Sequence, residues 1–251
     1  MLLFSGLTYD MKSLIVKDSP NRIQIIDGLR GLSILLMVAY HFGYDLVIFV
    51  GVSPQLIHNP VLDVLQSFFA GLFILMSGIS CRFSKSNLKR GLLMLPVAAA
   101  ITLVTWSIGF PVWFGIIHFL GISAILFSIV SPAIDKISRP VQFIIYIVLF
   151  LCSIQFTGRR YDVSWLWWLG FRPEGWSSAD YFPLIPWFFI YLLGTLVGTY
   201  ITENRLPRRF YAQRVPFFAA IGRNTMLIYV LHQPVLYVIT LMIKGIINAI
   251  Q

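Results

Sequence analysis

The chain has 251 residues, of which 58% are hydrophobic and only 12% are charged. Soluble domains usually contain about 45–50% apolar and about 25% charged residues, so this composition excludes an ordinary soluble domain, and it equally excludes a disordered chain, which is poor in apolar residues. Two cysteines are too few for a disulfide scaffold, and a net charge of +9 in so apolar a chain indicates basic membrane loops rather than a nucleic-acid-binding surface.

Seven apolar segments are long enough to cross a membrane. The hydrocarbon core is about 30 Å thick, so a spanning helix needs roughly 20 mostly apolar residues. The segments lack the period-two alternation of barrel strands, so helices are expected. The predicted fold class is therefore all-α, a polytopic transmembrane helix bundle of about seven spans. The predicted spans are 25–49, 62–81, 91–109, 112–131, 140–156, 181–201 and 224–247.

The first 24 residues do not have the pattern of a signal peptide. Asp10, Lys12, Lys17 and Asp18 interrupt the apolar run that such a peptide requires. Residues 1–24 are therefore predicted to be a cytoplasmic N-terminal segment, and residues 25–248 a single transmembrane domain. The sequence shows no internal repeat, which argues against the inverted-repeat plan of many transporters.

Basic residues are distributed unevenly between the two sides that seven spans define. With the N-terminus inside, 15 of the 19 lysines and arginines fall on the inner side. Cytoplasmic loops carry an excess of basic residues, so the N-terminus is predicted to be cytoplasmic and the C-terminus outside. The four basic residues on the outer side are Arg159, Arg160, Arg172 and Lys244.

Span one carries four ionisable residues where charge is costly. At about 100° per residue, Asp27, Arg30, His41 and Asp45 fall within about 60° of arc on one helix face. Such a stripe faces the bundle interior or a wet cavity. Arg30 is expected near the cytoplasmic boundary, about 16 Å along the axis from His41. Asp45 lies one turn beyond His41 and can hold and polarise its imidazole. The alternative for the stripe is a polar packing seam with capping at Asp27. For Asp27 itself, pairing with Arg30 is the expected role.

Two more histidines lie inside later spans. His118, in span four, is expected at a depth similar to that of His41, so the two histidines are predicted to share a site. His232, in span seven, precedes Pro234, which frees backbone carbonyls and favours a kinked helix that lines a cavity. The alternative for His118 is a hydrogen-bonded packing role. The alternative for His232 is that it and the next residue, Gln233, only satisfy the backbone groups that Pro234 frees.

Further candidates lie at the membrane boundaries. Asp180 opens span six, either as a helix cap or as a carboxylate that receives a polar acceptor. Arg223, at the inner start of span seven, is placed to bind phosphates together with Arg30. The outer connection 157–180 holds four tryptophans, which form either an interfacial belt or a platform for a sugar. No spacing of histidines and cysteines matches a metal motif, so no metal is expected.

Five blocks of the sequence, taken in order, resemble one known family. They are Asp27 to Leu32 with its continuation to His41 and Asp45, then Phe73 to Ser80, Phe114 to His118, Asp180 to Leu184, and Tyr229 to Pro234. Over roughly residues 22–245 the chain resembles the heparan-alpha-glucosaminide N-acetyltransferase catalytic-domain family. The spacing of Arg30 and His41, with ten residues between them, is also similar to a signature of the wider transmembrane acyltransferase superfamily, which includes the acyltransferase-3 proteins.

The resemblance implies an integral membrane acyltransferase that takes an acyl group, expected to be acetyl, from cytosolic acyl-CoA. The lysosomal family member acetylates a terminal glucosamine of heparan sulfate. This chain is much shorter and lacks an N-terminal lumenal domain, so the expected acceptor is an amino or hydroxyl group of an envelope sugar or a similar molecule. Residues 25–248 are then a single acyltransferase-like domain, expected in a prokaryotic inner membrane.

The resemblance also suggests roles for the candidate residues. An attacking amine or hydroxyl must lose a proton, and histidine suits this task. His41 is therefore assigned as general base or transient acyl carrier, with Asp45 orienting it. His118 is expected to orient the acceptor or to stabilise developing charge. The remaining assignments are Arg30 and Arg223 for the acyl-CoA donor, and Asp180 and His232 for the acceptor.

Two other functions fit the same residues. The intramembrane histidines and aspartates could form the relay of a proton-coupled transporter or channel. An inactive family member acting as a subunit would retain the residues without using them. The expected partners under the main hypothesis are membrane lipid, acyl-CoA and the sugar or amine acceptor, with no nucleic acid.

Overall fold

The structure is a computed structural model, and it describes residues 22–57 and 59–250. Within these ranges seven helices are long and apolar enough to cross a membrane, and no strand is formed. The prediction of an all-α, polytopic helical membrane protein is thereby confirmed. Most of the predicted segment 1–24 lies outside the described residues, and the side of the membrane on which the chain begins stays a prediction.

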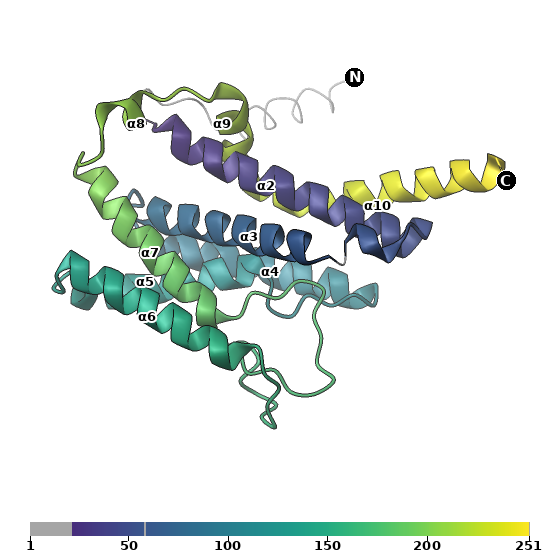
Figure 1. Cartoon of the computed structure of the whole chain (residues 1–251), viewed down its shortest axis with the longest axis horizontal. Helices are drawn as coiled ribbons and strands as arrows, with labels where there is room; N and C mark the ends of the chain where they lie inside the picture. Colours follow the sequence, from purple (N-terminus) through teal and green to yellow (C-terminus); the bar gives the residue numbers. More distant parts are fainter. Residues whose placement is uncertain (1–21, 58, 251) are drawn as a thin grey trace, which may run out of the picture. The chain divides into compact units, whose positions relative to one another are not determined.

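The seven long helices occupy the predicted spans with ends shifted by a few residues. Between them lie the short helices η2 (Pro54–Leu56), α8 (Arg208–Ala212) and α9 (Pro216–Arg223), and helix α2 continues into the π-helix η1 (Leu46–Val50) (Figure 1). The long helices are α2 (Gln24–Asp45), α3 (Pro60–Cys81), α4 (Asn87–Ser107), α5 (Ile116–Ile134), α6 (Arg139–Thr157), α7 (Leu184–Thr202) and α10 (Thr225–Ile250).

The shifts at helix starts have local causes. Helix α3 begins two residues earlier than predicted because Asn59 Oδ1 accepts a hydrogen bond from the backbone N–H of Leu62 at 2.9 Å and so caps the first turn. Helix α7 begins at Leu184 rather than at residue 181, and its cap residue Pro183 makes no side-chain cap. The expectation that Asp180 caps this helix is therefore wrong.

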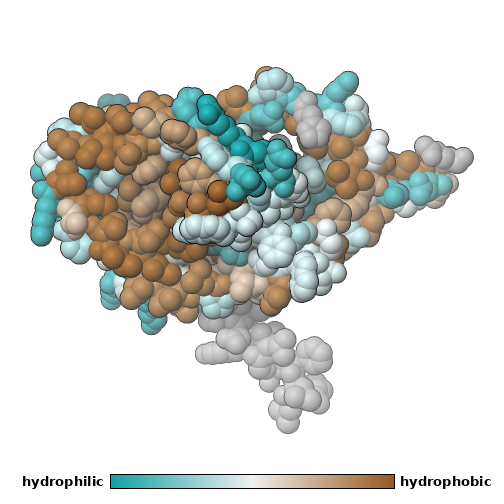
Figure 2. Space-filling model, turned by 90° about the horizontal axis from the view of Figure 1, so that it is seen from below, coloured by the Kyte–Doolittle hydropathy of each residue, from teal (hydrophilic) through white to brown (hydrophobic). Residues whose placement is uncertain are grey.

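Large apolar side chains point outward from the long helices. Leu93 of α4, Phe143 of α6 and Met242 of α10 are each more than half exposed, and Figure 2 shows broad areas of hydrophobic surface. Several buried positions are small or polar instead, such as Ser33 and Thr195. A protein in water would reverse this arrangement, whereas lipid-exposed helices require it.

The chain divides into two compact units. The first consists of the described residues up to Phe73 and those from Pro207 onward, and the second is Ile74–Leu206. In the first unit α2 packs against α9, α10 and η1. In the second unit α4 packs against α5, α6 packs against α7, and α5 also contacts α7. The single domain expected over residues 25–248 stays a prediction.

Close backbone contact joins α3 and α7 within the second unit. A Cβ atom added at Gly194 would lie 3.1 Å from the Cα of Gly78, and one added at Gly198 would lie 3.1 Å from the Cα of Ile79. Side chains at these positions would force the helices apart. The small-residue pair Gly194 and Gly198 therefore serves helix packing, as membrane helices commonly require.

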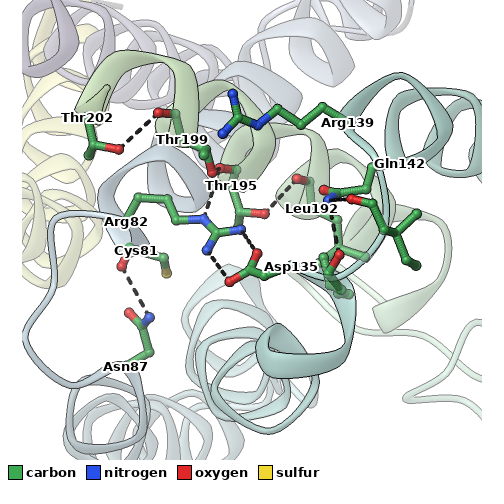
Figure 3. Close-up of polar contacts among 12 residues, drawn as sticks. Cys81, Arg82, Asn87, Asp135, Arg139, Gln142, Leu192, Thr195, Thr199 and Thr202 are labelled. Carbon is green, nitrogen blue, oxygen red and sulfur yellow. Dashed lines mark hydrogen bonds and ion pairs between the residues drawn. The ribbon is translucent and has the colours of Figure 1, made fainter. Parts of the chain in front are cut away.

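An arginine that follows α3 ties together one end of the second unit. The guanidinium of Arg82 donates to both carboxylate oxygens of Asp135, at 2.9 and 2.7 Å, and to the backbone carbonyl of Thr195 at 3.2 Å (Figure 3). It also lies over the ring of Phe127, 4.9 Å from the centroid. An arginine that is both bidentate and stacked fixes the relative positions of the groups it contacts, in addition to neutralising the carboxylate charge.

Candidate functional site

Helices α2 and α10 bring two of the predicted site histidines together. The imidazole rings of His41 and His232 lie with centroids 5.2 Å apart and planes inclined at 61°. Both belong to the first unit, in which α10 packs against α2. The predicted polar stripe of α2 is partly buried, since Asp27 and Asp45 are only 6% and 1% exposed. This face of α2 therefore turns inward, as predicted.

Asp45 is held by a residue for which the sequence suggested only a packing role. Gln233 Nε2 donates to both oxygens of the Asp45 carboxylate, at 2.9 and 3.1 Å. Gln233 follows His232 directly, so the carboxylate fixes the backbone turn that carries the histidine against His41. Asp45 thus contacts α10 through Gln233, the neighbour of the histidine that lies against His41. The orienting effect of Asp45 on His41 stays a prediction.

The same glutamine carries an unusual oxygen. Gln233 Oε1 is buried and has no hydrogen-bond partner among the described residues. Buried polar atoms are nearly always hydrogen-bonded, and an exception calls for an explanation such as a ligand. An amide oxygen only accepts hydrogen bonds, so a ligand that satisfies it must present an N–H or O–H group.

The tautomer of His232 follows from its backbone contact. Its Nδ1 lies 2.6 Å from the carbonyl oxygen of Tyr229. A carbonyl oxygen only accepts, so Nδ1 carries a proton, and in the neutral ring Nε2 is the basic nitrogen. This contact fits the packing role that was the alternative for His232, and it also fixes the ring beside His41.

Arg30 occupies the other end of the α2 stripe. Its guanidinium donates to Asp27 at 3.1 Å and to the backbone carbonyl of Gly222 at 3.4 Å. The expected pairing of Asp27 with Arg30 is confirmed. Arg22 also approaches Asp27, at 3.8 Å. Arg223 is the next residue after Gly222, so helix α9 brings the two predicted donor-binding arginines, Arg30 and Arg223, to the same end of α2.

Glycines allow this close approach of α9 to α2. A Cβ atom added at Gly31 would lie 2.8 Å from the backbone nitrogen of Gly222, and one added at Gly222 would collide with the carbonyl of Asp27. The backbones are therefore in direct contact where Arg30 reaches across. A larger residue at either position must displace helix α9.

His118 is positioned by α4 in the second unit. Its Nε2 lies 3.0 Å from Thr102 Oγ1, and that hydroxyl donates its single proton to the carbonyl of Val112 at 2.6 Å. The His118 bond must therefore run from Nε2–H to the hydroxyl oxygen, which leaves Nδ1 as the basic nitrogen of the neutral ring. Phe114 stacks on the imidazole at 5.9 Å. The predicted common site of His118 and His41 joins residues of the two units and stays a prediction.

Asp180 caps a helix distant in sequence. Its Oδ2 accepts a hydrogen bond from the backbone N–H of Ile116 at 3.0 Å, in the first turn of α5. A carboxylate at a helix N-terminus is stabilised by the N–H groups there and by the helix dipole. The cap lies two residues before His118. Asp180 therefore fixes the start of the helix that carries the histidine.

The connection between α6 and α7 contains an aromatic cluster. Trp167 and Trp176 stack at 5.5 Å, and the ring of Tyr181 meets Trp176 at 4.8 Å. The Tyr181 hydroxyl donates to the carbonyl of Trp167 at 2.6 Å. Burial raises the pKa of Tyr181 to about 12, although Arg172 and Arg160 nearby oppose this. Both predictions for these tryptophans, a belt or a sugar platform, stay predictions.

Arg90 is a further polar residue of the second unit. Its guanidinium donates to Ser77 Oγ at 3.0 Å and to the sulfur of Cys81 at 3.6 Å. Among the residues that the structure describes, Arg90 forms no ion pair with a carboxylate. Nothing in the spacing of the sequence singled out the contact of Arg90 with Ser77.

No group of three or more histidine, cysteine, aspartate or glutamate side chains within residues 22–57 and 59–250 is arranged to hold a metal ion.

Comparison with protein families gives one match. The sequence model of the family described as "Heparan-alpha-glucosaminide N-acetyltransferase, catalytic" matches residues 22–234, which is most of the chain. Searches of curated proteins and of solved structures gave no match.

Proposed function

The chain belongs to the heparan-alpha-glucosaminide N-acetyltransferase catalytic-domain family, and from this premise we propose that it transfers an acetyl group from cytosolic acetyl-CoA to an amino or hydroxyl group of an envelope sugar or a similar acceptor. The family and the seven apolar helices make it an integral membrane acetyltransferase. The observation that carries the finer proposal is the contact of His41 with His232 beside the Asp45–Gln233 pair. A prokaryotic inner membrane is the proposed location.

In the proposed reaction the amine or hydroxyl attacks the thioester carbonyl of acetyl-CoA. A bond forms between the acceptor atom and the acyl carbon, the carbon–sulfur bond breaks, and CoA leaves as a thiolate. The acceptor proton passes to His41, the general base, and then to the departing thiolate. A positioned histidine typically contributes about 10²- to 10⁴-fold to such a step. Asp45 acts through Gln233 and His232 to keep the base in place.

Gln233 is proposed to receive the acceptor. Its buried Oε1 needs a hydrogen-bond donor, and an amine or hydroxyl supplies one at the side of the His41–His232 pair. Such a bond would hold the attacking atom while His41 removes its proton. The thioester carbonyl of the donor offers only an acceptor oxygen and cannot fill this position. His232, next in sequence, is proposed to contact the acceptor as well.

His118 and Asp180 are proposed to serve the acceptor from the second unit. With Nε2–H donated to Thr102, neutral His118 presents a basic Nδ1. A basic nitrogen receives a hydrogen bond from an acceptor hydroxyl, so orientation is favoured over stabilisation of negative charge, which would require a donor. Asp180 is proposed to act close to this histidine, at the helix start that it caps.

Arg30 and Arg223 are proposed to bind the phosphates of the donor. They lie at the same end of α2, and Arg30 is about 16 Å from His41 along the helix, a distance that the extended pantetheine arm of CoA can bridge. Arginine suits phosphate because its planar guanidinium donates two parallel hydrogen bonds. Arg30 already donates to Asp27, which holds the guanidinium in one orientation before the donor arrives.

Calorimetric titration of acetyl-CoA into the purified protein in nanodiscs tests the proposal. Arg30→Ala should weaken saturable binding by about tenfold or more, because a charge-assisted contact contributes about 1.5–3 kcal/mol. His41→Ala should retain binding and lose transfer. Arg159→Ala, an exposed arginine on the α6–α7 connection, is the matched control and should bind as wild type does.

Other outcomes would overturn the proposal. A folded protein that binds neither acetyl-CoA nor longer acyl-CoAs would exclude the donor and leave proton-coupled transport through the same residues. Normal transfer by His41→Ala would exclude it as the base. If His41 carries the acetyl group itself, mass spectrometry after incubation with acetyl-CoA alone should show an acetylated α2 peptide, and the general-base step would then be replaced.

A further inference from the structure

The connection between the last two spans is strongly basic. It runs from the end of α7 at Thr202 to the start of α10 at Thr225 and contains the short helices α8 and α9. Between Thr202 and Thr225 the sequence has five arginines and a single acidic residue, Glu203. Because it joins two membrane spans, this segment lies at a membrane surface.

Three of these arginines are exposed and have no acidic partner. Arg208, Arg209 and Arg214 are exposed, and none of them forms an ion pair within the described part of the chain. Arg205, just before them, differs because it pairs with Glu203 at 2.8 Å. Three unpaired cations within seven residues make a local positive field that suits an anionic ligand.

An apolar side chain accompanies the arginines. Phe217, in the first turn of α9, is 67% exposed, although the opposite side of the helix is buried at Ala219 and Gly222. Helix α9 therefore packs one face against α2 and turns another face, which carries Phe217, outward. Exposed arginines beside an exposed phenylalanine are the pattern of segments that lie in the headgroup region and place an aromatic ring at the acyl boundary.

We infer that the segment Arg208–Phe217 binds the headgroups of anionic phospholipids in the leaflet where it lies. Charge complementarity favours lipid phosphates, and the neighbouring phenylalanine favours a lipid over a soluble anion. Juxtamembrane arginines gain about fivefold in affinity each from an anionic leaflet. The inference is independent of the acetyltransferase reaction, since it uses none of the residues assigned to transfer.

Lipid binding at this segment can also act on the polar stripe of α2, because helix α9 contacts α2. Helix α9 contacts α2 through Gly31 and Gly222, and Arg30 donates to the carbonyl of Gly222 at 3.4 Å. Headgroups bound at Arg208 to Phe217 would hold α9 against α2 and so stabilise the position of Arg30. A protein moved into neutral lipid would keep its fold and lose this support.

Native mass spectrometry of retained lipids tests the inference. The protein is equilibrated in mixed micelles with equal amounts of phosphatidylglycerol and phosphatidylcholine, and the ratio of the two bound lipids is measured. Wild type should prefer phosphatidylglycerol. The triple variant Arg208→Gln, Arg209→Gln, Arg214→Gln should lose about tenfold or more of that preference. The control variant Lys85→Gln, Lys89→Gln, Lys136→Gln removes the same charge from exposed positions elsewhere and should retain it.

Four results would overturn the inference in whole or in part. An equal loss in both triple variants would mean that general basic charge, not this segment, selects the lipid. No preference in wild type would remove the site. Displacement of phosphatidylglycerol by inorganic phosphate at millimolar concentration would identify a site for soluble anions instead. An unchanged lipid preference in Phe217→Ser would exclude a contribution of the phenylalanine ring to lipid binding.

Discussion

The hydrogen bond between Asp45 and Gln233 should couple α2 to α10 measurably. Asp45 is 1% exposed, so water does not readily replace Gln233 when the side chain is cut back. Hydrogen bonds to charged groups contribute about 1.5–3 kcal/mol, whereas bonds between membrane helices average about 0.6 kcal/mol and reach about 1.7 kcal/mol. The two ranges overlap near about 1.5 kcal/mol, which is the expected coupling energy.

A double-mutant cycle measures this coupling. The free energies of unfolding of wild type, Asp45→Ala, Gln233→Ala and the double variant are determined in mixed micelles. The coupling energy is the destabilisation of the double variant minus the sum of the destabilisations of the two single variants. Asp63→Ala combined with Gln233→Ala is the control, because Asp63 is exposed on α3 and should be additive. Additivity of the Asp45 and Gln233 changes within about 0.3–0.5 kcal/mol would refute the reasoning.

Three further predictions concern other contacts. Gly222→Ala should lower the free energy of unfolding by about 1–3 kcal/mol through overpacking, whereas Gly245→Ala, with open space around it, should be neutral or stabilising in a thermal unfolding assay. The hydrogen bond from Arg139 lowers the pKa of Glu203 below its ordinary value of 4.5. The stabilisation that this ion pair gives the fold is therefore present above that pH and lost as the pH falls. The Tm difference between wild type and Glu203→Gln should vanish in acid, and an unchanged difference would show that the ion pair does not stabilise the fold. Thr102→Val removes the acceptor that orients the α5 histidine and should lower transfer about 2- to 10-fold, with Thr102→Ser near wild type.

Most of the fold could be predicted from composition and hydropathy. Seven long apolar runs could be located from the sequence because lipid requires about 20 apolar residues for each helix. Helix ends were less predictable, since they depend on single capping contacts, some with neighbouring residues and some with distant ones. Asn59 lengthens α3 at its start, and the carboxylate of Asp180 caps α5 across a separation of 64 residues.

The candidate site was predictable within helices and not between them. The angular position of His41 and Asp45 on one face of α2 follows from helix geometry alone. The partner of Asp45 does not, because the register of α10 against α2 is set by packing along both helices. From the sequence, Gln233 was therefore expected only to satisfy the backbone groups that Pro234 frees. The structure alone reveals its two hydrogen bonds to the Asp45 carboxylate.

The proposed function requires that His41 of α2 activate an acceptor for acetyl transfer from acetyl-CoA. The most direct measurement is release of free CoA from acetyl-CoA by protein in nanodiscs, with and without glucosamine as a test acceptor, for wild type, His41→Ala and the exposed-arginine control Arg159→Ala. We expect acceptor-dependent release in wild type and control, and a loss of at least about 10²-fold in His41→Ala. Equal acceptor-dependent release by His41→Ala and wild type would contradict it.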